Sequence, residues 1–203
     1  MSVIRPKINN YKISIKFPGF TQLKKCINAF RQNSNHQKHI TSKQSLNFYI
    51  YRSPLRFVYT FFYSGHINVT SLKSEEDIQK SISHVYQCFN LPLSLQHESQ
   101  IDNISASGGL NLITHFKSLK ALCNQIERTK DEFDVSKVSY ETQKFSGATL
   151  KKCASNYFKG KGCVLLFNNS KFIIVGCSSL EEIQNIHNWI EIVTFNAHVK
   201  LSK

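Results

Sequence analysis

The chain has 203 residues, 41% of them hydrophobic, which is enough for one large folded domain or two small ones that share a core. Lys and Arg number 26 against 13 Asp and Glu, so the formal net charge is +13. An excess of this size favours a polyanionic partner such as nucleic acid. The apolar runs are far shorter than the about 20 residues that a membrane-spanning helix needs, which argues against a membrane protein.

The cysteines and histidines do not form a metal-binding or secretory pattern. No CxxC pair occurs, no His-Cys cluster has zinc spacing, and residues 1–10 have no apolar signal region. We therefore expect reduced thiols in an intracellular protein, with no metal and no cofactor. The six cysteines are Cys26, Cys88, Cys123, Cys153, Cys163 and Cys177.

The first half of the chain predicts a strand, a helix, further strands and a second helix. Residues 11–17 alternate between apolar and polar side chains, as in a strand with one buried face. Leu23, Ile27 and Phe30 then have helical spacing, and residues 33–43 form a polar loop. A β-branched strand follows, and Ser74 with Asp77 predicts the N-cap of a helix that ends at Phe89.

The second half repeats this order. A strand at residues 104–110 precedes helical spacing at Leu119, Leu122 and Ile126. An acidic loop at residues 129–136 and a Lys- and Gly-rich hairpin tip at 157–162 come next. The last helix is predicted from Ser179 to about Ile190, with Ser178 and Glu181 at N-cap and N3 spacing.

Two segments, residues 64–79 and 169–184, show the repeat most clearly. Each has a turn, a short strand, a polar break and an amphipathic helix, so internal duplication is the simplest explanation. The break between the halves falls at residues 91–99, and the predicted repeats are 1–92 and 93–203. This order favours an α+β fold: an antiparallel sheet with helices on one face, and a helix-free face open to a large ligand.

Several motifs in this order resemble the TATA-binding protein family over nearly the whole chain. SYETQKFSG at residues 139–147 is similar to the family's SYEPELFPG, and VLLFNNSKFIIVG at 164–176 to its LLIFxSGKVVLTG. FYSG at 62–65, continuing to KSEE at 73–76, resembles FSSGKMVxTGAKSEE, and PKINN at 6–10 resembles PxLQN.

The resemblance implies a TBP-like saddle of two pseudo-twofold repeats, in which a curved antiparallel sheet carries helices on its convex face. It also implies a non-enzymatic general transcription initiation factor in the nucleus. Such a protein binds A/T-rich, TATA-type promoter DNA in the minor groove, bends it by Phe insertion and nucleates preinitiation-complex assembly.

The family uses two Phe pairs as wedges between base steps. Phe145 and Phe167 match both members of the second pair, and Phe62 matches one member of the first. Its partner falls near residues 44–46, where no Phe occurs, so Leu46 is the apolar candidate. Each Phe has core packing as the alternative role, since the chain contains 15 of them.

The family's hydrogen-bond donors to the central base pairs are two Asn and two Thr. Asn10 and Asn103 match both Asn, and Thr70 matches the first Thr. Val175 replaces the second Thr and cannot donate. Turn or strand-edge roles are the alternative for the two Asn residues.

Phosphate contacts and partner contacts are predicted on the same basis. The candidate phosphate-binding residues are Lys12, Arg52, Arg56, Lys73, Lys151, Lys152 and Lys171. Glu141 matches an acidic position that contacts general factor IIB in the family, whereas Gln143 and Lys144 replace an acid and a Leu. The expected partners are therefore duplex DNA, a factor IIB-like protein and other general factors, and the RNA polymerase machinery, with no small-molecule substrate.

Three alternatives stay open at this point. In the first, the chain is a TBP-like paralogue or viral relative that has lost TATA specificity and regulates transcription by binding proteins, in the nucleus or at a cytoplasmic site of viral replication. In the second, the chain is an enzyme, since similar saddle halves occur in some DNA glycosylases and ribonucleases, although no catalytic constellation is visible. Or it is an adaptor that binds proteins through its helices.

Overall fold

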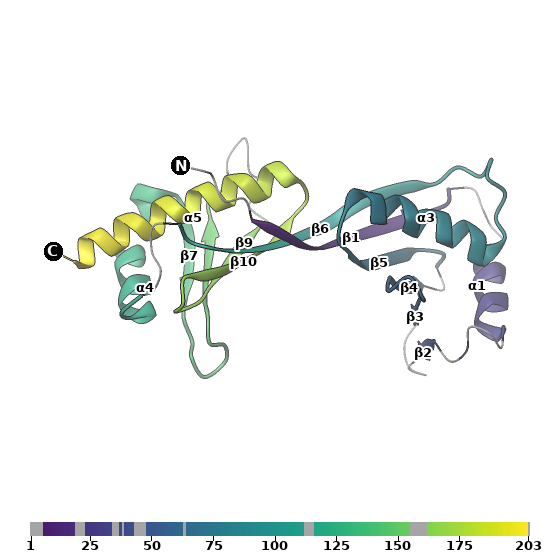
Figure 1. Ribbon diagram of the computed structural model, residues 1–203, viewed down its shortest axis with the longest axis horizontal. Helices are drawn as coiled ribbons and strands as arrows, with labels where there is room; N and C mark the ends of the chain where they lie inside the picture. The colour runs from purple at the N-terminus through teal and green to yellow at the C-terminus, as the bar shows by residue number, and fades with distance from the viewer. Residues whose placement is uncertain are drawn as a thin grey trace. The chain divides into compact units, whose positions relative to one another are not determined.

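A computed structural model describes residues 6–18, 23–33, 37, 39–42, 48–62, 64–111, 116–154 and 162–202 (Figure 1). Leu46, residues 44–45 and residues 157–161 of the predicted hairpin tip lie outside this part of the chain, as do residues 34–36, 38 and 43 of the predicted polar loop at 33–43. The loop prediction is wrong for residues 40–42, which form a short strand. Among the described residues, none of the helices combines the length and the apolar character that crossing a membrane requires.

The described residues form ten strands, and every strand pairing whose register is known is antiparallel. The hydrogen-bonded order is β2-β3-β4-β5-β1-β6-β10-β9-β8-β7. The strands are β1 Lys7–Lys16, β2 Ile40–Ser42, β3 Phe48–Arg52, β4 Val58–Phe62, β5 Ile67–Leu72, β6 Glu98–Gly109, β7 Val135–Ser139, β8 Ala148–Lys152, β9 Cys163–Leu166 and β10 Lys171–Cys177. The helices are α1 Leu23–Gln32, α3 Glu75–Phe89, α4 Leu119–Arg128 and α5 Leu180–Leu201, with a short 3₁₀ helix η1 at Lys130–Phe133.

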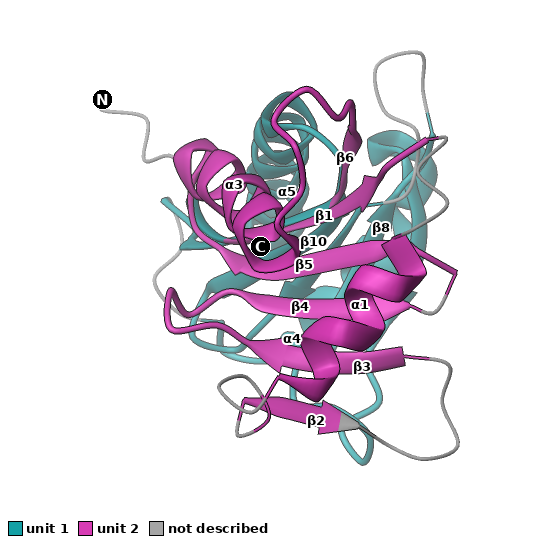
Figure 2. Cartoon of the chain, turned by 90° about the vertical axis from the view of Figure 1, so that its right-hand side faces the viewer, with its two compact units in different colours: residues 1–9, 103–203 teal, residues 10–102 magenta. Residues whose placement is uncertain are grey.

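The chain divides into two compact units (Figure 2). Unit 2 is residues 10–102, and unit 1 holds the chain up to residue 9 and from residue 103 onward. Strands β1 and β6 each begin in one unit and end in the other. The predicted repeats, 1–92 and 93–203, are continuous segments of sequence and are not the same as these units. The first repeat lies mostly in unit 2 and the second mostly in unit 1, and the repeat boundaries stay a prediction.

In unit 2, α1 and α3 lie against one face of the sheet. The helix-facing side chains of β3 and β4 are Tyr49, Tyr51, Tyr59 and Phe61, each 0–1% exposed. The hydroxyl of Tyr49 donates to the Ile27 carbonyl and that of Tyr59 to the Ser81 carbonyl, so the buried phenols are satisfied by helix backbone. The three α1 residues predicted from their spacing, Leu23, Ile27 and Phe30, are all buried.

In unit 1, α4 packs against α5 and β7, and α5 packs on β9 and β10. The predicted α4 positions Leu119, Leu122 and Ile126 are buried. The last helix does not end near Ile190 as predicted but continues to Leu201. It continues because the buried face goes on through Val193, Thr194 and Ala197.

The two long helices begin with the same cap. The Ser74 hydroxyl accepts from the Asp77 N–H, as predicted for α3. In α5 the predicted pair Ser178 and Glu181 is wrong by one residue, because the Ser179 hydroxyl accepts from the Glu182 N–H. Ser178 instead donates its N–H and its hydroxyl to the Glu182 carboxylate, at 2.6 and 2.9 Å.

The predicted acidic loop at residues 129–136 contains regular structure. η1 occupies Lys130–Phe133, Asp134 has the left-handed conformation at φ 53°, and β7 begins at Val135. The Trp189 indole on α5 donates to the Phe133 carbonyl at 2.7 Å and holds this turn against the helix. Each unit is thus an antiparallel sheet with helices on one face, which confirms the predicted α+β class.

Candidate nucleic-acid interface

The described helices of each unit lie on one face of its sheet, and we call the other face the open face. In unit 1 the open face carries the cross-strand row Ser107, Ile173, Leu165 and Thr149, followed by the row Val175, Cys163 and Lys151. Residues between these positions, such as Ile174, Val164 and Leu150, are fully buried on the helix side. The open face of unit 1 is therefore largely apolar, with basic side chains at its margin.

Phe145 and Phe167 form an exposed aromatic pair on unit 1. Their ring centroids are 5.7 Å apart at an interplanar angle of 67°, and Phe145 is 40% exposed. Gly147 makes room for the pair, since a Cβ there would lie 2.7 Å from Cε1 of Phe145 and 3.1 Å from Cε1 of Phe167. Both residues predicted as wedges of the second repeat thus lie together, and neither is part of the core beneath the helices.

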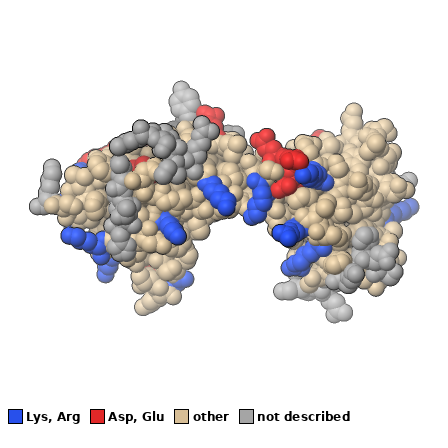
Figure 3. Space-filling model, viewed as in Figure 1, with Lys and Arg blue, Asp and Glu red and all other residues tan. Residues whose placement is uncertain are grey.

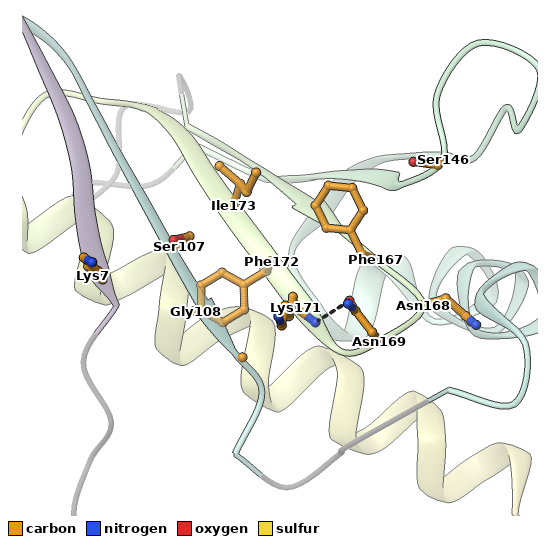
Figure 4. A pocket seen from close by; sticks show the side chains of 11 residues that line it. Lys7, Ser107, Gly108, Ser146, Phe167, Asn168, Asn169, Lys171, Phe172 and Ile173 are labelled. Atoms are coloured by element: carbon orange, nitrogen blue, oxygen red, sulfur yellow. Dashed lines mark hydrogen bonds between the residues drawn. The ribbon is translucent and has the colours of Figure 1, made fainter. Parts of the chain in front are cut away.

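A hollow of about 830 Å³ adjoins this pair. Figure 4 shows Phe167 and Ile173 beside it, with Ser107 and Gly108 of β6 across from them. Gly108 carries no Cβ, which would lie 2.7 Å from Cζ of the buried Phe172. The hollow is shallow and apolar and is lined by Phe167 of the aromatic pair, so a flat apolar group of a ligand would fit against it.

Unit 2 has its own aromatic pair, which includes a residue that the sequence interpretation missed. Phe48 of β3 is the register partner of Phe62 of β4, and their ring centroids are 5.6 Å apart. In unit 1, continuing the β8–β9 register by one residue places Gly147 opposite Phe167. Since Phe62 corresponds to Phe167, its register partner Phe48 occupies the place that Gly147 has in unit 1. Phe48 is therefore an aromatic neighbour of Phe62 at a place where unit 1 has a glycine, and the predicted Leu46, two positions earlier, lies outside the described residues.

Asn10 and Asn103 have equivalent contacts. The Oδ1 of Asn10 accepts from the Ser71 N–H and the Oδ1 of Asn103 from the Gly176 N–H, both at 2.7 Å. Ser71 and Gly176 have φ values of 68° and 86°, so each Asn bonds to a left-handed residue within a strand. Because each carbonyl oxygen is engaged, the amide NH₂ is the group that each Asn offers to a ligand.

The other predicted donor positions lie on the open faces. Thr70 is the register partner of Val58, and Val175 is the partner of Cys163. Burial raises the pKa of the Cys163 thiol, against the opposing effect of Lys151. All six cysteines are free, and burial raises the pKa of Cys88 and Cys123 to about 11 and that of Cys177 to about 12. Within the described ranges no group of three or more His, Cys, Asp or Glu side chains has a metal-binding arrangement.

The predicted phosphate-binding residues do not all lie on the open faces. Lys151 and Lys171 are exposed at open-face positions of unit 1, whereas Lys152 is half-buried opposite Val135, at a helix-side position. In unit 2, Arg52 is exposed and donates to the Thr41 hydroxyl, and Arg56 lies in the β3–β4 turn. Figure 3 shows Lys and Arg side chains on both units in one view.

The remaining two predicted phosphate-binding residues, Lys12 and Lys73, each contact an aspartate. The Lys12 ammonium lies 3.6 Å from the Asp102 carboxylate, and the Lys73 N–H donates to Asp77 at the start of α3. The predicted partner residues Glu141, Gln143 and Lys144 are all exposed in the turn between β7 and β8, where Lys144 forms an ion pair with Glu141.

Comparison with solved structures identifies the fold. The TBP of Methanococcus jannaschii matches 95% of this chain and 99% of its own, with a TM-score of 0.67 and 20% identity. The chain has the fold of a TATA-binding protein. No family model matches the sequence, and neither does any curated protein.

Two enzymes give much weaker structural matches. A heterotetrameric sarcosine oxidase from Corynebacterium has a TM-score of 0.34 and 6% identity, over 96% of this chain and 84% of its own. The aspartate kinase of Clostridium acetobutylicum has a TM-score of 0.26 and 6% identity, over 95% of this chain and 34% of its own. Scores this low do not indicate a shared fold, so the TBP-like fold stands as the structural result.

Proposed function

We propose that this protein binds duplex DNA through its open faces, enters the minor groove and bends the duplex by inserting aromatic side chains. The observation that carries the proposal is an aromatic pair on the open face of each unit, Phe145 with Phe167 and Phe48 with Phe62. Phe62 takes the place of Phe167, and Phe48 takes that of Gly147. Proteins that unstack base steps from the minor groove use apolar wedges of this kind.

The chemistry of the open faces supports the minor groove. A·T pairs present only acceptors there, so a reader needs few donors and a large van der Waals surface. The NH₂ groups of Asn10 and Asn103 supply donors, and Ile173, Leu165 and Val175 supply apolar contact. The net charge of +13 supplies the phosphate attraction.

The wider role in this proposal is that of a general transcription initiation factor acting in the nucleus without enzymatic activity. A protein that bends promoter DNA offers its helices and turns to other factors. The exposed turn with Glu141, Gln143 and Lys144 is the proposed contact for a factor IIB-like partner. The Lys144–Glu141 ion pair leaves this surface less acidic than the family motif predicts.

A relative of TBP without TATA specificity is the second candidate. It is favoured by Val175, which cannot donate where the family has a Thr, and by the basic and acidic pair Lys12 and Asp102 in unit 2. Affinity for a TATA duplex and for a shuffled duplex of the same composition separates the two candidates. Equal affinities favour the second.

The test of groove binding compares two Phe residues of matched exposure. Phe145 is 40% exposed on the open face, and Phe195 is 41% exposed on α5. We expect Phe145→Ala to weaken binding to an A/T-rich duplex by about thirtyfold or more, since truncating a hot-spot aromatic costs about 2 kcal/mol or more. Phe195→Ala should leave the Kd unchanged. Equal losses in the two variants, or no binding by the unmodified chain, would overturn the proposal.

A further inference from the structure

A carboxylate lies on the open face of unit 2. The Ser14 hydroxyl donates to Oδ1 of Asp102 at 2.8 Å, and the Lys12 ammonium lies 3.6 Å from Oδ2. Ser14 belongs to the cross-strand row with Asn68 and Thr60, whereas Ile13 and Ile15 on either side of it pack beneath the helices. Ser14 is itself only 8% exposed, and the Asp102 side chain is 26% exposed. Because Ser14 points away from the helices, the carboxylate that it binds is on the open face as well.

Unit 1 contains the equivalent pair with one change. The Ser107 hydroxyl donates to Oδ1 of Asn9 at 3.1 Å. The pairs correspond, because Asn10 and Asn103, one residue after Asn9 and Asp102, make the same bond to a left-handed residue. At one structural position, unit 1 therefore has an amide and unit 2 has a carboxylate.

The residues around the two positions differ in the same direction. Asn68 and Thr60 in unit 2 take the places of Ile173 and Leu165 in unit 1, as the cross-strand rows through Ser14 and Ser107 show. The Oδ1 of Asn68 also lies 2.7 Å from Nε2 of His66, which orients that amide. The open face of unit 2 is thus equipped for hydrogen bonding where that of unit 1 is apolar.

A carboxylate on this face has a definite preference among base pairs. It accepts hydrogen bonds and cannot donate, whereas an A·T pair offers only acceptors in the minor groove. Guanine is the one base with a minor-groove donor, its exocyclic N2 amino group. Asp102 has capacity for that bond, because a carboxylate has about four acceptor sites and Ser14 occupies one of them.

We infer that unit 2 recognises a G·C base pair in the minor groove, with Asp102 accepting from the guanine amino group, while unit 1 binds A·T pairs through apolar contact. This inference rests on the proposed minor-groove binding. Ser14 and Lys12 are positioning residues that hold the carboxylate and reduce its repulsion of the phosphates. The preferred DNA site is then asymmetric: A/T-only in one half, with a guanine in the other.

Inosine provides the direct test, because an I·C pair lacks the N2 amino group and is otherwise a G·C pair. We would place single G·C or I·C pairs at each step of an A/T duplex and measure the Kd of the full chain for each duplex. At one or two steps in one half of the site, G·C should bind about tenfold more tightly than I·C, since hydrogen bonds to charged groups contribute about 1.5–3 kcal/mol.

Two matched variants assign the effect to the carboxylate. Asp102→Asn gives unit 2 the amide of unit 1 and should reduce the G·C to I·C preference, because a neutral amide oxygen accepts more weakly than a carboxylate. Binding to the A/T duplex should be retained or strengthened. Asn9→Asp should create a second preferred G·C step in the other half of the site. Thermal unfolding of both variants would verify that the folded chain is being compared.

The outcomes separate this inference from the function on which it rests. If the unmodified chain binds the A/T duplex but prefers I·C at every step, the recognition of guanine is wrong and groove binding stands. A preference for G·C that is undiminished in Asp102→Asn also overturns the role of the carboxylate. If the chain binds no duplex at all, the proposed function fails together with the inference.

Discussion

At the scale of single residues, the missing Cβ of Gly147 decides whether the Phe145–Phe167 pair can form. A methyl group there would lie 2.7 Å from Phe145 and 3.1 Å from both the Leu166 carbonyl and Phe167. Backbone cannot yield as a side chain can, so the Phe145 ring is the group that must move. The geometry of the pair thus depends on the absence of a side chain at Gly147.

We predict that Gly147→Ala weakens DNA binding about tenfold, because it separates the two rings without removing either. Gly109→Ala is the matched control. Gly109 also lies on the open face of unit 1, and its new Cβ would approach nothing closer than the Ser170 carbonyl at 4.0 Å. Fluorescence anisotropy on one A/T-rich duplex measures both. A loss as large in the control as in Gly147→Ala would refute this role for Gly147.

At the scale of single residues the sequence shows side-chain chemistry but not strand register. The family motif indicated Phe145, Phe167, Asn10 and Asn103 as site residues and Leu46 as the partner of Phe62; these roles stay predictions, and Leu46 lies outside the described residues. Phe48 becomes visible only when β3 is paired with β4, since a shift of two residues preserves the strand face and leaves the alternation unchanged. The Ser14–Asp102 pair joins residues 88 apart, and no local pattern predicts it.

At the scale of elements, the caps explain why two helices in different units begin alike. Ser74 and Ser179 each accept from the N–H three residues on, and the Asp77 and Glu182 carboxylates accept from the backbone N–H four residues before them. The sequence predicted the first cap correctly, but in the run of two serines it placed the second cap one residue too early, at Ser178. The end of α5 was missed because no Gly or Pro marks it before Leu201.

We predict that Ser179→Ala lowers the free energy of unfolding by about 1 kcal/mol, because it leaves the Glu182 N–H without its acceptor. Ser178→Ala should cost less, since the Ser178 N–H remains and still donates to Glu182. Urea unfolding of the two variants measures the difference. An equal or larger loss in Ser178→Ala would show that the cap is at Ser178 after all.

His187 on α5 predicts a pH dependence of stability. The side chain is 1% exposed, and burial lowers its pKa below the usual 6.5, an effect that Glu191 opposes. Between the lowered value and 6.5 the unfolded chain binds more protons than the folded chain, so the free energy of unfolding falls as the pH falls through this window. His187→Leu should flatten this dependence. Thermal unfolding between pH 7.5 and 5 measures it, and an unchanged slope in the variant would contradict the assignment.

At the scale of the whole molecule, the charge of +13 predicts strongly salt-dependent binding. The logarithm of the affinity should fall linearly with the logarithm of the salt concentration, with a slope near −0.9 for each phosphate contact. Lys171→Gln should reduce the magnitude of the slope by about 0.9, because Lys171 lies on the open face of unit 1. Lys200→Gln, on α5 and paired with Glu132, is the control and should leave the slope unchanged. Affinity that is flat with salt would favour a protein-binding adaptor.

The central claim is that aromatic pairs on the open faces insert into the minor groove and bend DNA, and the bend angle tests it most directly. We would measure the end-to-end distance of a doubly labelled A/T-rich duplex by energy transfer, with the unmodified chain and with single Ala variants. The unmodified chain should bend the duplex sharply. Phe145→Ala and Phe167→Ala should reduce the bend and the affinity most, because the open face of unit 1 is the more apolar. Phe62→Ala and Phe48→Ala should reduce both by less, and Leu46→Ala least. A duplex that stays straight at saturating protein, or an unchanged bend angle in all five variants, would contradict the account.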